Sequence, residues 1–163
     1  MRDLIDPSVL RKAVDAAMKR YPYFCVELRK VDNQYVFTDN SRPVVISNSL
    51  HGTELNAKGS NYHMIAFAYY DNWIILDVFH GLTDGTGAYE VIRTLLYYYY
   101  SERYNIKLKD DGIRLVGDEI TQEEWMTLLK KRPVFRSHLV PDCLKHEHHR
   151  KRRFAVRPNK NGI

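Results

Sequence analysis

Residues 73–87 read WIILDVFHGLTDGTG, and this stretch decides the fold. Residues 73–80 are apolar and rich in β-branched and aromatic side chains, which predicts a strand. His80 stands at its end, in phase with the aliphatic residues Ile74, Leu76 and Val78. An imidazole at the edge of an apolar face is expected to be neutral and able to accept a proton. The glycines at 85 and 87 leave room for a second backbone or a ligand to approach.

The sequence on either side of this stretch predicts an α+β protein. Asp6 and Pro7 mark a helix start, and apolar residues at three- and four-residue spacing continue the helix through Arg20. Two hairpins with two-residue turns are expected, over 23–38 and 62–80. The other expected elements are a short edge strand over 42–46, a loop over 47–60, a helix over 86–104 and a short helix over 122–129. This order of helix, strands and helix predicts a mixed β-sheet packed by helices.

The spacing His80-x-x-x-Asp84-Gly85 resembles the histidine motif of the superfamily of chloramphenicol acetyltransferase, peptide-synthetase condensation domains and alcohol O-acetyltransferases. Residues 4–14 and 20–24 are similar to the helix and strand that open condensation-type domains. Residues 95–100 are similar to the helix after the motif in bacterial alcohol O-acetyltransferase-like proteins. The resemblance is closest to this last group and runs from about residue 4 to about residue 105, with a weaker echo near residues 153–157.

The resemblance implies one half of the superfamily's two-layer sandwich and an acyltransferase activity. His80 would be the general base that activates an alcohol or amine, which then attacks the thioester of acetyl-CoA or another acyl-CoA. Acyl-CoA would be a co-substrate, and no permanently bound cofactor is expected. Related proteins carry the motif in the first of two similar halves. We therefore expect residues 1–131 to be an N-terminal half domain, either natural or truncated, and 132–163 to be a basic, irregular tail or linker.

Two further residues of the motif have structural roles by resemblance. In the superfamily the aspartate, here Asp84, points away from the channel and pairs with an arginine, but Cys25 occupies the position of that arginine. Arg29 and Arg93 are alternative partners, and a turn or helix-capping role for Asp84 is equally open. Gly85 is expected to provide room for the backbone.

Composition narrows the class of protein. The chain has 163 residues, 44% hydrophobic, with no apolar run long enough for a membrane span. Two distant cysteines fit reduced thiols, and a cytoplasmic location is expected. The net charge is +5, but residues 145–163 carry seven Lys or Arg and one acid, a net charge of +6, so the rest of the chain is at −1. A nucleic-acid-binding face on the folded part is therefore not expected, nor is membrane association.

Two further clusters, the histidines in 146–149 and the tyrosines at 97–100, are not expected to take part in catalysis. The histidines in 146–149 precede the basic run 150–153, which would repel cations, so no metal site is expected. The tyrosines at 97–100 surround a helix, so one of them must be exposed or covered by something outside the helix. A covering surface could be a missing second half or another copy of the chain. The alternative function is a catalytically inactive partial domain that acts as an interaction or scaffold protein.

Overall fold

The computed structural model describes residues 3–124, 135–136 and 151–157. Its elements follow one another as α1 (Pro7–Arg20), η1 (Pro22–Phe24), β1 (Val26–Val31), β2 (Gln34–Asp39), β3 (Ile46–Asn48), η2 (Lys58–Ser60), β4 (Ile65–Tyr70), β5 (Trp73–Phe79), α2 (Gly85–Tyr104), β6 (Phe135–Arg136) and β7 (Lys151–Val156). The predicted α+β class is confirmed. No helix within the described ranges combines the length and apolarity that a membrane crossing requires.

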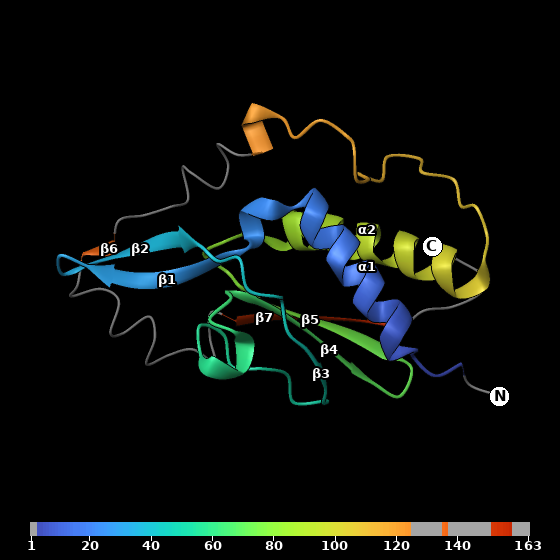
Figure 1. The fold of residues 1–163 in the computed structure, drawn as a ribbon, viewed down its shortest axis with the longest axis horizontal. Coiled ribbons are helices and arrows are strands. Elements are labelled where there is room, and N and C mark those ends of the chain that lie inside the picture. Colours follow the sequence, from blue (N-terminus) through green and yellow to red (C-terminus); the bar gives the residue numbers. More distant parts are fainter. Residues whose placement is uncertain (1–2, 125–134, 137–150, 158–163) are drawn as a thin grey trace.

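The strands form two open sheets. A four-stranded sheet has the order β3-β4-β5-β7, in which β3 and β4 are parallel and the other pairs antiparallel. A three-stranded sheet has the order β1-β2-β6, and the β1–β2 hairpin reaches away from the helices as an arm (Figure 1). Both predicted hairpins are present with two-residue turns. At the first turn Asp32 and Asn33 both have positive φ, 46° and 63°, as the tight turns of twisted hairpins require.

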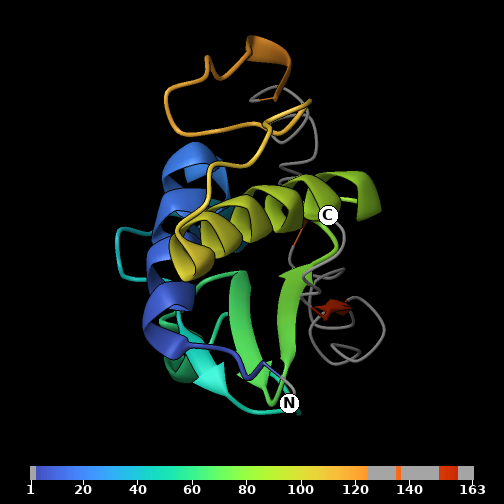
Figure 2. The same ribbon diagram turned by 90° about the vertical axis from the view of Figure 1, so that its right-hand side faces the viewer.

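Helices α1 and α2 cover one face of the four-stranded sheet (Figure 2). Asp6 caps α1 by accepting hydrogen bonds from the amides of Ser8 and Val9. The predicted apolar stripe of this helix is buried, as is most of the predicted core face of α2. Every second residue of β4 and β5 meets the two helices in one core. Its members include Leu10, Val14, Ile65, Phe67, Ile74, Leu76, Val78, Val91 and Leu95.

The opposite face of the same sheet holds an ion pair whose carboxylate is buried. Asp77 of β5 is 1% exposed, and its Oδ1 lies 3.0 Å from Nε of Arg153, its register partner on β7. Arg153 also donates to the carbonyl oxygens of Leu50 and His51 at 3.1 and 2.5 Å. The loop meets the pair so closely that a Cβ on Gly52, where φ is +74°, would lie 2.1 Å from Asp77 Oδ2. The ion pair thus joins β5, β7 and the loop after β3.

Several boundaries differ from the sequence-based expectations. The edge strand expected over 42–46 lies at 46–48, and β4 starts at Ile65 rather than residue 62. The tail expected to be irregular from residue 132 contains β6 and β7. The strand β7 forms because its backbone completes the edge of β5 and its Arg153 neutralises Asp77, and neither partner is near it in sequence.

We expect Arg153→Met to lower the free energy of unfolding by about 2 kcal/mol, because it removes the cation that faces the buried Asp77 carboxylate. The value is below that of a fully enclosed pair because the Arg153 side chain is 40% exposed. Urea unfolding followed by tryptophan fluorescence measures the change. Arg29→Met is the matched control: Arg29 is 59% exposed, and its partner Glu27 retains Arg42. Equal losses in both variants would contradict the importance of the Asp77 pair.

Candidate functional site

His80 lies in the turn between β5 and α2, one residue beyond the strand in which the sequence placed it. The amide of Phe79 still pairs with the carbonyl of Met64 at 3.0 Å, so the position of the strand is fixed up to that residue. The chain then turns sharply, and the amide of Leu82 donates to the carbonyl of Phe79 at 2.9 Å. The His80 side chain is exposed at this turn.

The imidazole of His80 has a defined orientation. Its Nδ1 lies 3.2 Å from the carbonyl oxygen of Thr83. A carbonyl oxygen can only accept a hydrogen bond, so Nδ1 carries a proton, and in the neutral ring the lone pair is on Nε2. A neutral ring in this tautomer can act as a base through Nε2, and the exposed position of the side chain makes it accessible.

Asp84 is the N-cap of α2. Its Oδ1 accepts a hydrogen bond from the amide of Gly87 at 3.1 Å, which satisfies one of the free donors at the start of the helix. Gly85 is the first residue of the helix. Of the two arginines considered as partners of Asp84, Arg29 pairs with Glu27, and Arg93 pairs with Glu90 and the carbonyl of Asp111. Asp84 thus caps the helix, and each of the two arginines has a carboxylate of its own.

Cys25 follows η1 and is half-buried. Burial, with a smaller effect from Asp39, raises the pKa of its thiol to about 11. It therefore remains protonated near neutral pH and cannot replace an arginine as a cation.

A pocket of about 390 Å³ borders the same turn at Leu82, Thr83 and Asp84. Its wall combines aromatic rings, carboxylates and the first residues of α2. His80 is not part of that wall, whereas Thr83 and Asp84 are. Among the described residues, the lining is Tyr21, Tyr23, Phe24, Leu82, Thr83, Asp84, Thr86, Gly87, Glu90, Arg114, Thr121, Glu123 and Glu124.

A buried ion pair between Arg20 and Glu124 adjoins this pocket, whose lining includes Glu124 but not Arg20. Both Glu124 carboxylate oxygens accept hydrogen bonds from Arg20, at 3.0 and 3.1 Å, and Oε2 also accepts one from the Tyr23 hydroxyl at 3.0 Å. Arg20 is only 2% exposed. Burial opposes ionisation, but the bonds from Arg20 and Tyr23 outweigh it and lower the pKa of Glu124. The sequence contains no signal for this pair, because its members are 104 residues apart.

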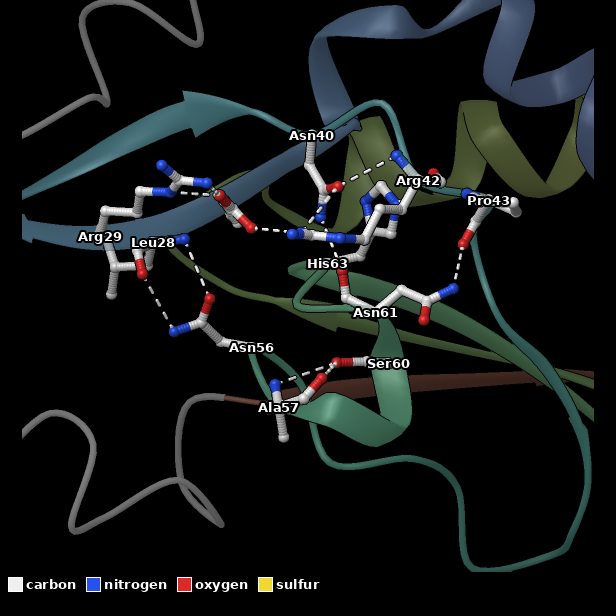
Figure 3. Close-up of polar contacts among 11 residues, drawn as sticks. Leu28, Arg29, Asn40, Arg42, Pro43, Asn56, Ala57, Ser60, Asn61 and His63 are labelled. Carbon is white, nitrogen blue, oxygen red and sulfur yellow. Dashed lines mark hydrogen bonds and ion pairs between the residues drawn. The ribbon is translucent and has the colours of Figure 1, made fainter.

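His63, the other histidine close to the turn, belongs to a separate polar cluster (Figure 3). It is fully buried, and its Nε2 donates to the carbonyl of Arg42 at 2.7 Å. Its Nδ1 is buried, and among the described residues it has no hydrogen-bond partner. Around it, Glu27 binds Arg29 and Arg42, and Asn56 both accepts from the amide of Leu28 and donates to its carbonyl. This cluster joins β1 to the loop before β4 and is structural.

The tyrosines at 97–100 are covered from within the chain. Tyr99 and Tyr100 are buried, while Tyr97 and Tyr98 are half-buried. The hydroxyl of Tyr98 accepts a hydrogen bond from the amide of Val116 at 2.8 Å, because the segment after α2 folds back over the helix (Figure 2).

The described ranges contain no group of three or more His, Cys, Asp and Glu side chains that could hold a metal ion. The histidines in 146–149 lie outside those ranges. Comparisons with protein-family models, with curated proteins and with solved structures return no match.

The free energy of unfolding is expected to decrease as the pH is lowered below about 6.5, the ordinary pKa of histidine. Burial, more than any other cause, lowers the pKa of His63 in the folded state, so the unfolded chain takes up the proton first and acid favours unfolding. Urea unfolding at pH 7.5, 6.5 and 5.5 measures the effect.

The matched variant for this experiment is His63→Gln, whose amide nitrogen can still donate to the Arg42 carbonyl but has no imidazole to titrate. The loss of stability between pH 7.5 and 5.5 should be smaller in this variant than in the wild type. An identical pH dependence in the two proteins would show that His63 is not the responsible group.

Proposed function

We propose that this chain is an acyltransferase-type domain that transfers an acyl group, such as acetyl, from a coenzyme A thioester to an alcohol or amine. His80 is the general base. The observation that carries the proposal is the hydrogen bond from His80 Nδ1 to the Thr83 carbonyl, which leaves Nε2 as an accessible base at the end of a rigid strand.

The reaction needs one proton relay. Nε2 removes the proton from the acceptor hydroxyl or amine as its oxygen or nitrogen bonds to the thioester carbonyl carbon. The tetrahedral intermediate then collapses, the carbon–sulfur bond breaks, and the imidazolium returns the proton to the coenzyme A thiolate. The products are an ester or amide and free coenzyme A, and His80 ends as it began.

The order of elements supports this proposal. An N-terminal helix, a strand that ends next to the histidine and a helix capped by the motif aspartate follow one another, which is consistent with the opening helix and the helix after the motif that the resemblance implies. The protein departs from that pattern at Cys25. The Asp84 cap provides a different means of holding the turn.

The proposal is tested by following thiol release from acetyl-CoA with a panel of short alcohols and amines. We expect His80→Ala to reduce any turnover by about 10²–10⁴-fold, the usual contribution of a general base. His51→Ala is the matched control, since His51 is also an exposed histidine and its contacts to Ser49 and Arg153 are made by its backbone. Equal turnover in the wild type and His80→Ala would remove His80 as the base.

One observation favours the alternative of an inactive partial domain: the pocket beside the turn is not lined by His80. A scaffold of this kind has no use for acetyl-CoA. Calorimetric titration with acetyl-CoA separates the two functions, because saturable binding at micromolar concentration supports the acyltransferase and the absence of any binding supports the scaffold.

A further inference from the structure

Gly87, in the first turn of α2, contacts the residue that orients His80. A Cβ atom at position 87 would lie 2.0 Å from Oγ1 of Thr83 and 3.3 Å from Thr83 Cβ. Real Cβ atoms essentially never approach another heavy atom to 2.0 Å, so any side chain at position 87 must displace Thr83. Turning the Thr83 hydroxyl away relieves only the shorter contact, and the Thr83 Cβ still presses on the substituent.

Thr83 has little freedom to absorb such a displacement. It is 7% exposed, and its carbonyl oxygen accepts the bond from His80 Nδ1. On the other side, the amide of Gly87 is held by Asp84 Oδ1 at 3.1 Å, and the amide of Ala88 by the Asp84 carbonyl at 3.2 Å. The first turn of the helix is therefore tied to the turn that carries the histidine.

The bond from His80 is sensitive to small movements. At 3.2 Å it is at the long end of the usual range for a nitrogen–oxygen hydrogen bond. A movement of Thr83 by a few tenths of an ångström lengthens or misaligns it. Without this bond no other hydrogen bond among the described residues holds the proton on Nδ1. The ring can then turn or place its proton on Nε2, where it blocks proton uptake.

We propose that Gly87 is a positioning residue for His80: the absence of a side chain at 87 lets Thr83 sit where its carbonyl fixes the imidazole with Nε2 free. This inference rests on the proposed role of His80 as the base. It extends the His80–Asp84–Gly85 motif by a residue that acts through Thr83 and has no contact with the substrate.

The test is the Gly87→Ala variant, read by long-range proton–nitrogen NMR of the histidine rings at pH 8.5. The His80 signals are assigned by their loss in His80→Gln. The wild type is expected to show His80 with the proton on Nδ1, and Gly87→Ala should show averaged or Nε2-protonated signals. Where turnover is measurable, it should fall on the order of 10–100-fold, as for other small misplacements of a catalytic group.

Two matched variants isolate the contact. Alanine is a better helix former than glycine, so Gly59→Ala, where a Cβ meets nothing within 4 Å, controls for the substitution itself and should leave the His80 signals unchanged. The double variant Thr83→Ala with Gly87→Ala removes the 2.0 Å overlap while keeping the Thr83 carbonyl. It should regain part of the Nδ1-protonated signal, because only the milder 3.3 Å contact with the Cβ of residue 83 remains. General destabilisation does not produce such a rescue.

An unchanged His80 spectrum in folded Gly87→Ala overturns the proposal, as does an Nε2-protonated wild type. If Gly87→Ala does not fold, Thr83→Val decides, because its larger methyl group presses on position 87 from the other side. An unchanged His80 spectrum there also overturns it. The spectrum does not depend on turnover. An inactive wild type with the expected ring signals would therefore contradict the acyltransferase function and leave the positioning by Gly87 intact.

Discussion

Strand β5 is the constraint on which the rest of the structure depends, because it is buried on both faces. One face packs Ile74, Leu76 and Val78 against the helices, and the other face carries Asp77. A carboxylate in that position has to be paired with a cation, so Arg153 of β7 and the loop around Gly52 are brought to it. The strand is thereby held rigidly up to the residue before His80.

Because the strand end is held in place, the histidine that follows it has a defined position. The direction of the chain at Phe79 is fixed by its pairing with Met64, and the helix that follows is fixed by the Asp84 cap. The short turn between them has few conformations available, and the bond from His80 to the Thr83 carbonyl selects one ring orientation. A catalytic base requires this kind of preorganisation, because orientation contributes to the rate only if it is set before the substrate arrives.

Buried polar groups away from the turn stabilise the same frame. The Arg20–Glu124 pair attaches the segment after α2 to the end of α1, and the cluster around His63 attaches β1 to the loop before β4. His63 is followed directly by Met64, the residue that pairs with Phe79, so this structural histidine supports the strand that presents the exposed one. The two rings illustrate how burial decides the role of a histidine: one is enclosed, and the other is accessible.

The sequence alone determined the two long helices, both hairpins and the place of His80, because these depend on contacts between near neighbours. Apolar spacing predicted the buried stripe of α1, and Asp32–Asn33 predicted its turn, since helical periodicity and positive φ angles are local properties. It also left capping by Asp84 as one of two open roles.

Tertiary structure decided that Asp84 caps α2, which residues surround the turn and that residues 151–156 form a strand. Asp77 and Arg153 are 76 residues apart, and Arg20 and Glu124 are 104 apart, so no local pattern connects them. The contact between Gly87 and Thr83 depends on the exact path of the turn. Long-range pairs of this kind form only when the whole chain has folded, since their benefit comes from burial that no isolated segment achieves.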